Sequence, residues 1–145
     1  MIRIATPSDI PVLIELSIEA LEIDPYPELV ISREKVARQV TASISSAKHF
    51  AWVSERDGKV VGGLIAIVDD MLTYERSMCV VCMWYCRVKG DGLKLMAQFM
   101  AWVRSRPMVK QVQYTNDRHM DPRIAGYLIN QYGFKDDVKF LYKMR

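Results

Sequence analysis

The spacing of hydrophobic residues alternates between helical and strand periodicity along the chain. Apolar side chains recur every three or four positions in four stretches, which predicts four amphipathic helices over residues 10–23, 33–46, 93–104 and 122–132. Shorter runs alternate or are apolar throughout, which predicts strands over residues 2–5, 50–54, 60–68, 78–86 and 109–116. One or two closing strands are expected between Phe134 and Tyr142.

Local signals mark where these elements begin and end. The run Thr6-Pro7-Ser8-Asp9 offers an N-cap hydroxyl, a proline in the first helical turn and an acid, so it predicts a helix start. The prolines in 24–27 stop that helix. Asp57-Gly58 predicts a tight hairpin between two strands. Asp121-Pro122 begins the last helix, and Gly133 ends it.

The order of elements predicts a single α+β domain over residues 1–145. The succession β-α-α-β-β-β-α-β-α-β indicates a mixed sheet, antiparallel in its first half, with the later helices as crossovers. The apolar run 60–68 predicts a strand that is covered on both faces. Gly62-Gly63 within it favours a bulge or a close contact with a helix over a ligand contact.

Composition and charge exclude several classes of function. The net charge is +3 with dispersed Lys and Arg, which argues against a nucleic-acid surface. No apolar run approaches the ~20 residues that span a bilayer, so we expect no membrane partner and a cytoplasmic location. The sequence leaves a monomer and a homodimer both open.

Three cysteines, Cys79, Cys82 and Cys86, lie within one predicted strand. Because side chains alternate along a strand, Cys79 is expected to point away from Cys82 and Cys86. A metal site would need a fourth ligand, and none is evident nearby. The sequence therefore favours buried, reduced thiols and no bound metal.

The stretch from Cys86 to Met96 carries the main candidate chemistry. It reads as the end of a strand, a turn with Gly90 and Gly92, and the start of a helix. A helix start offers unpaired N–H groups and the positive end of the helix dipole, and glycines let a phosphate approach the backbone. Neither the P-loop pattern nor the dinucleotide fingerprint fits these residues.

The pattern that does fit is Arg87-x-x-Gly90-x-Gly92, which resembles the [Q/R]-x-x-G-x-[G/A] turn of the GNAT acyltransferase superfamily. Residues 2–10 look like the first strand and helix of that family. Ala125 followed by Tyr132-Gly133-Phe134 is similar to its closing motif. The resemblance covers the whole chain and extends to small phage-encoded members. It implies a GNAT-like fold, with a central mixed sheet of six to seven strands flanked by four helices.

The resemblance implies an N-acyltransferase that uses acetyl-CoA or another acyl-CoA and no metal. The amine of a small molecule or a protein would attack the thioester directly in a ternary complex. Residues implied in coenzyme A binding are Tyr85, Cys86, Arg87, Val88, Lys89, Gly90, Asp91, Gly92, Leu93 and Asn116.

Several positions depart from the family pattern. Ile129 stands where the family often has a tyrosine that protonates the departing thiolate, and the strand 78–86 has no carboxylate to act as a base. The remaining candidates for the base are Glu75, His119, Asp69 and Asp70, and a water-relayed base is equally possible. Tyr127 and Tyr132 lie near the position of the absent acid, but on other faces of the helix. These departures keep open an alternative, a catalytically inactive GNAT-fold binding or structural protein such as a phage virion or inhibitor component.

Asp91 departs as well, because it places a carboxylate between the two glycines. Its side chain either caps the helix and competes with a phosphate, or points to solvent with its charge offset by Arg87, Lys89 and Lys94. We expect the second arrangement. Two interpretations are open for the aromatic and acidic residues near the predicted site. In one, an acceptor pocket is lined by Trp84, Tyr85, Tyr114, Asp69 and Asp70; in the other, the three aromatic residues belong to the core.

Overall fold

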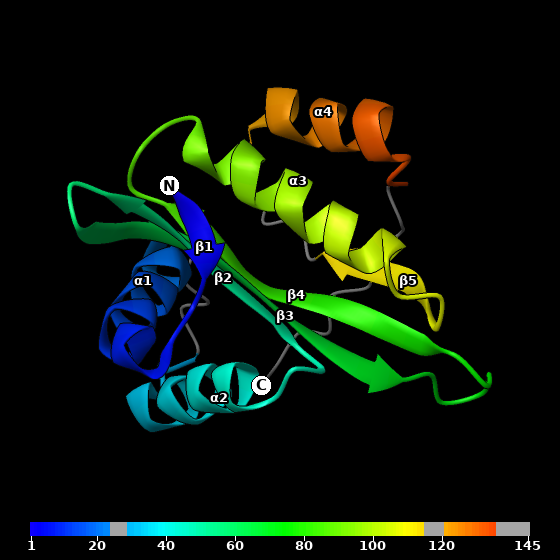
Figure 1. Cartoon of the computed structure of the whole chain (residues 1–145), viewed down its shortest axis with the longest axis horizontal. Coiled ribbons are helices and arrows are strands. Elements are labelled where there is room, and N and C mark those ends of the chain that lie inside the picture. Colours follow the sequence, from blue (N-terminus) through cyan, green and yellow to red (C-terminus); the bar gives the residue numbers. More distant parts are fainter. Residues whose placement is uncertain (24–28, 115–120, 136–145) are drawn as a thin grey trace.

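The structure, a computed structural model, describes residues 1–23, 29–114 and 121–135. Its helical elements are η1 (Pro7–Asp9), α1 (Ile10–Ile23), α2 (Arg33–Ser45), α3 (Asp91–Arg104) and α4 (Pro122–Tyr132). Its strands are β1 (Ile2–Ile4), β2 (Phe50–Arg56), β3 (Lys59–Asp70), β4 (Ser77–Cys86) and β5 (Val109–Tyr114). Figure 1 shows α1 and α2 on one face of the sheet and α3 and α4 on the other. The four predicted helices are confirmed.

The sheet is mixed, as predicted. Its strands follow the order β1-β2-β3-β4-β5; the pairs β1–β2, β2–β3 and β3–β4 are antiparallel, and the pair β4–β5 is parallel. The parallel pair needs a crossover, which α3 supplies. Five strands lie in the described part of the chain, and most of the region expected to hold a sixth or seventh, 136–142, lies outside it. No helix of the described segments is long and apolar enough to cross a membrane.

Two hydrophobic layers enclose the sheet. On one face Phe50, Leu64 and Phe99 belong to the layer under α3 and α4. On the other face Val53, Ile65 and Leu13 belong to the layer under α1 and α2. Neighbouring residues of β3 thus contribute to opposite layers, which confirms the expectation that this strand is covered on both sides.

A β-bulge at Cys82 interrupts the alternation of β4. Ile65 pairs with Met83 and Ala66 pairs with Val81, so Cys82 has no partner on β3. Beyond an extra residue the side chains of a strand change face. Cys79 and Cys86 therefore both belong to the layer under α3, whereas Cys82 belongs to the layer under α1 and α2. The expectation that Cys86 points away from Cys79 is wrong. The expectation that Cys82 points away from Cys79 is confirmed.

Gly62 and Gly63 allow close packing in β3. A Cβ on Gly62 would lie 2.2 Å from the Cys86 sulfur, and one on Gly63 would lie 2.8 Å from a methyl group of Leu13 in α1. The contact of Gly63 with α1 agrees with the expected close contact with a helix, whereas Gly62 lies against β4.

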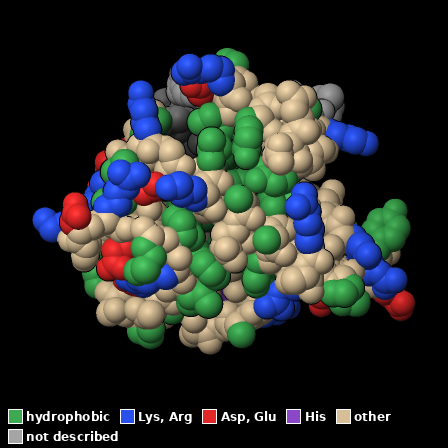
Figure 2. Space-filling view, turned by 45° about the horizontal axis from the view of Figure 1, so that its top comes forward, with side chains coloured by type: hydrophobic (Ala, Val, Ile, Leu, Met, Phe, Trp, Pro, Cys, Tyr) green, Lys and Arg blue, Asp and Glu red, His purple; other side chains and the backbone are tan. Residues whose placement is uncertain are grey.

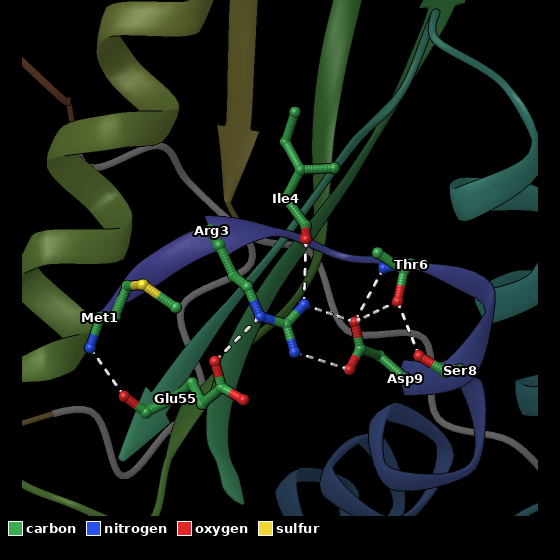
Figure 3. A network of polar contacts seen from close by, with 7 residues as sticks. All are labelled: Met1, Arg3, Ile4, Thr6, Ser8, Asp9 and Glu55. Atoms are coloured by element: carbon green, nitrogen blue, oxygen red, sulfur yellow. Dashed lines mark hydrogen bonds and ion pairs between the residues drawn. The ribbon is translucent and has the colours of Figure 1, made fainter. Parts of the chain in front are cut away.

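A polar network ties the first strand to the start of α1 (Figure 3). The Arg3 guanidinium donates to both Asp9 oxygens, at 2.8 and 3.0 Å, and to Glu55 at 3.1 Å. Asp9 also accepts from the backbone N–H of Thr6 at 2.7 Å. The hydrogen bond from Arg3 lowers the pKa of Asp9, burial raises it, and the hydrogen bonds from Thr6 lower it again. The pKa of Asp9 therefore lies below its ordinary value. The network fixes where α1 leaves the edge of the sheet.

Candidate functional site

A cavity of about 770 Å³ opens at the carboxyl end of β4, where the sheet meets the first turn of α3. Its volume is typical of small-molecule and cofactor sites. It is lined by Ile23, Trp84, Tyr85, Cys86, Arg87, Val88, Lys89, Gly90, Gly92, Leu93, Tyr114, Asp121, Arg123 and Ile124. On the face that brings α3 and α4 toward the viewer, Figure 2 shows a band of hydrophobic side chains with Lys and Arg side chains on both sides.

The two glycines of the turn have different roles. Gly90 is the N-cap of α3 with φ of 95°, a conformation that a side chain disfavours. Gly92 lies against Trp84, whose indole nitrogen donates to the Gly92 carbonyl at 2.8 Å. A Cβ at position 92 would lie 3.4 Å from that nitrogen. The turn therefore depends on Gly90 for its backbone conformation, whereas a Cβ at position 92 would make only an ordinary van der Waals contact with Trp84.

The backbone N–H groups of residues 88–93 are available to a ligand. Within the described ranges, none of them donates a hydrogen bond to another residue. Arg87, just before them, donates its N–H to the carbonyl of Val61 at 2.8 Å, which fixes the end of β4. Free amides at a helix start, together with the helix dipole, favour an anion such as a phosphate.

Asp91 is buried, and both expected arrangements of its side chain are wrong. Its carboxylate accepts from the Ser54 hydroxyl at 2.6 Å and from two Arg56 nitrogens at 2.9 and 2.8 Å. It neither points to solvent nor caps α3. Both partners come from β2, some 35 residues earlier, so no local pattern could reveal them. Arg56 and Ser54 hold the pKa of Asp91 far below its ordinary value.

This arrangement explains how an acid is tolerated in an anion-binding turn. The Arg56 guanidinium compensates the Asp91 charge, and Lys94 lies 3.8 Å from the same carboxylate. The carboxylate is engaged by β2 and leaves the turn amides free.

Arg87 lies in the cavity wall and is paired with α1. Its guanidinium donates to the Glu19 carboxylate, with Nε to Oε2 at 3.0 Å. Arg87 is the main cause that lowers the pKa of Glu19. Tyr85 also contacts Glu19. Burial is the main cause that raises the pKa of the Tyr85 phenol, and the nearby Glu19 carboxylate raises it further.

Most of the residues expected to bind coenzyme A come together at this cavity. Those that line it are Tyr85, Cys86, Arg87, Val88, Lys89, Gly90, Gly92 and Leu93. Asp91 is turned toward β2 instead, and Asn116 lies outside the described residues. Trp84 and Tyr114 also line the cavity, with ring centres 5.6 Å apart in an edge-to-face contact.

The residues expected to act as acid or base are not brought together. Glu75 lies just before β4, whose ten residues separate it from the cavity by about 30 Å. Asp69 and Asp70 end β3 at that same distant edge. Tyr127 packs edge to face against Tyr132, with ring centres 5.9 Å apart, and is not among the cavity residues. His119 lies outside the described part of the chain.

Sequence reasoning missed five residues of the site or its border. Ile23, Asp121, Arg123 and Ile124 line the cavity, and Glu19 pairs with Arg87. Glu19 and Ile23 are four residues apart, so they share one face of α1. That spacing was visible in the sequence, but the partner 68 residues away was not.

The cysteines are poor nucleophiles in this structure. Burial raises the pKa of Cys79 to about 12 and that of Cys86 to about 11, with a further contribution from Asp91 at Cys86. Among the residues that the structure describes, no group of three or more His, Cys, Asp or Glu side chains could hold a metal ion.

Known proteins resemble this chain in structure. No family model and no curated protein matches its sequence. A predicted acetyltransferase from Clostridium acetobutylicum, solved with acetyl-CoA, matches with a TM-score of 0.77 and 16% identity over 99% of this chain and 95% of the other. A possible acetyltransferase from Clostridium difficile 630 matches with a TM-score of 0.73 and 13% identity over 100% and 97%.

An aminoglycoside acetyltransferase from an uncultured soil metagenomic sample, solved in complex with trehalose, matches with a TM-score of 0.70 and 17% identity over 100% and 95%. The agreement thus extends over the full length of the chains and does not stop at a shared substructure. It includes the mixed sheet and the helices on both of its faces. The chain has the fold of the GNAT acetyltransferases.

Proposed function

We propose that this protein transfers an acetyl or other acyl group from acyl-CoA to a primary amine. The observation that carries the proposal is the group of free backbone amides at residues 88–93, in the wall of a cavity large enough for a cofactor. Gly90, at a positive φ and with nothing within 4 Å of where a Cβ would lie, leaves that wall open to a diphosphate. The solved structures similar to this chain, one of them with acetyl-CoA, support the same function.

The cavity offers different chemistry at its two sides. The turn beside α3 presents Lys89 and the amides, which suit the diphosphate of coenzyme A. Trp84 and Tyr114 supply an apolar wall near the end of β5, which suits the uncharged arm that carries the thioester. Ile23, at the end of α1, and Tyr85, which packs under α1, line the opposite side of the cavity. The acceptor amine would enter from that side.

The reaction needs little from the protein beyond orientation. The neutral amine attacks the thioester carbonyl carbon, the carbon–sulfur bond breaks, and the coenzyme A thiolate takes up a proton as the amine loses one. Holding both substrates together lowers the barrier by removing translational freedom. No carboxylate lies on β4, so we propose that water relays the proton from the amine.

One observation favours a second candidate, a GNAT-fold protein that binds acyl-CoA without catalysis. Ile129 occupies the position of the expected tyrosine acid, and Glu75 and Tyr127 are not among the residues of the cavity. A protein of this kind would keep the anion-binding turn and lack turnover.

Calorimetry and turnover assays separate the two candidates. Titration with acetyl-CoA is expected to give a dissociation constant in the micromolar range, and Gly90→Val is expected to weaken it because position 90 requires a positive φ. Gly133→Val, at a positive φ of 73° at the end of α4 and outside the residues that line the cavity, is the matched control. Release of the coenzyme A thiol with a panel of amines supports the transferase. Binding without release supports the second candidate, and no binding overturns both.

A further inference from the structure

We propose that Glu19 is the residue that holds a cationic acceptor amine, and that in the free protein Arg87 occupies it. On this proposal a diphosphate bound at residues 88–93 draws Arg87 away and frees the Glu19 carboxylate. Binding of acyl-CoA therefore prepares the acceptor site. The proposal rests on the function proposed above and assigns it an acceptor-binding residue and a class of acceptor.

The position of Glu19 is the first argument. Glu19 lies one helical turn before Ile23, which lines the cavity, and the two share a face of α1. Its carboxylate contacts Arg87 and Tyr85, both of which line the same cavity. Glu19 therefore lies at the border of the cavity on the side opposite α3.

The charges on the two sides are the second argument. α1 carries Glu15, Glu19 and Glu22 and has no Lys or Arg. The turn beyond β4 carries Arg87 and Lys89 together with the start of α3. One border of the cavity thus suits an ammonium group and the other suits phosphates, and the Arg87–Glu19 pair joins the two borders.

The pair is suited to exchange partners. Both side chains are partly exposed, 41% for Arg87 and 36% for Glu19, so neither is locked in the core. An exposed ion pair adds little stability, and it is easily replaced by a stronger one. A diphosphate carries more negative charge than one carboxylate, and a guanidinium can bind it through two parallel hydrogen bonds. Arg87 is therefore expected to prefer the phosphates when they are present.

Glu15 provides a matched control. It lies four residues before Glu19 on the same helix and pairs with Arg33 of α2, not with Arg87. Glu15→Gln and Glu19→Gln remove the same formal charge from neighbouring turns of α1. A difference between the two variants therefore reports on the Arg87 pair more than on the general electric field of the helix.

The first measurement is titration of coenzyme A into the wild type and both variants. Glu19→Gln is expected to bind about two- to fivefold more tightly than Glu15→Gln, because Arg87 no longer has to leave a partner. Equal affinities of the two variants would overturn the exchange of partners and leave the proposed function intact. No binding by any of the three proteins would remove the proposed function and this inference with it.

The second measurement is titration of cationic amines, spermidine and sisomicin, with and without saturating coenzyme A. The wild type and Glu15→Gln are expected to bind an amine about two- to fivefold more tightly when coenzyme A is present, the same factor by which loss of the Arg87–Glu19 pair favours coenzyme A. Glu19→Gln is expected to lose this gain, and Glu19→Asp, which keeps the charge, to retain part of it. Amine binding that is indifferent to coenzyme A, or equal in Glu19→Gln and Glu15→Gln, would overturn the assignment.

A kinetic readout separates binding from a merely structural role. With any amine that is turned over, Glu19→Gln is expected to raise KM for the amine about tenfold or more with kcat within about threefold of the wild type. A fall in kcat at unchanged KM would overturn the assignment of Glu19 to acceptor binding. Thermal unfolding midpoints of the two glutamine variants are expected to agree, since both residues lie on the surface of α1.

Discussion

Asp91 provides the sharpest test of how the anion-binding turn is held. We expect Asp91→Asn to lower the free energy of unfolding by about 3 kcal/mol, because a buried group that loses its charge leaves Arg56 and Ser54 with a poorer partner. Only 4% of the Asp91 side chain is exposed, so little water reaches position 91 to replace the lost contacts, although the Arg56 side chain is 47% exposed and can be hydrated. Urea unfolding followed by circular dichroism measures the change, and a shift of roughly 6–12 °C in the midpoint of thermal unfolding should accompany it.

Ser54→Ala is the graded control. It removes one of the three short hydrogen bonds and leaves the ion pair with Arg56 in place, so a loss of about 1 kcal/mol is expected. If Asp91→Asn costs less than about 0.5 kcal/mol, the contacts with β2 do not hold the start of α3, and the reasoning fails.

The difference between wild type and Asp91→Asn should also depend on pH. The pKa of Asp91 is lowered in the folded state, so the unfolded chain takes up a proton more readily than the folded one. The stabilisation by Asp91 is therefore fully present above the unfolded pKa of about 3.9 and is lost as the pH falls below it toward the lower folded value. Unfolding of both proteins at pH 7, 5, 4 and 3 should show the two curves approaching each other below pH 4. A constant difference over that range would contradict the assignment.

Three further predictions follow from packing and burial. Gly62→Ala should destabilise the fold by about 1–3 kcal/mol, because its Cβ would lie 2.2 Å from the Cys86 sulfur, and Cys86→Ala in the same chain should recover part of the loss in urea unfolding. Cys86 and Cys79 should react with Ellman's reagent at pH 8 about 100-fold more slowly in the native protein than in urea, since burial raises their pKa values to about 11 and 12; equal rates would argue against burial. Tyr127→Phe should leave kcat within about threefold of the wild type, because the phenol packs against Tyr132 and is not among the cavity residues, whereas a fall of 10²-fold or more would make it the acid.

Sequence patterns predicted the elements well because their signals are local. The hairpin glycine at 58 and the left-handed Gly133 lie where the patterns placed them. The turn from 87 to 92 was also found, since its glycines and its strand–helix context lie within a few residues of each other.

What the sequence could not give were partners brought together by the sheet. Ser54 and Arg56 meet Asp91, and Glu19 meets Arg87, across 35 or more residues of chain. No local rule states which charged residue will face which. The same limit applies to the acid–base candidates. Glu75 is close to β4 in sequence, but it precedes the first residue of that strand, and the cavity lies at the last.

The bulge at Cys82 has a consequence for changes in chain length. It sets the faces of the sheet that Trp84 and Tyr85 occupy. Trp84 belongs to the layer under α3, and Tyr85 belongs to the layer under α1. Straightening the bulge without removing a residue would turn the last four residues of β4 over as a block and exchange their neighbours, whereas deleting Cys82 would restore regular alternation and leave those four residues on their present faces. The register of this strand, more than any single side chain in it, decides whether a donor side and an acceptor side exist at all.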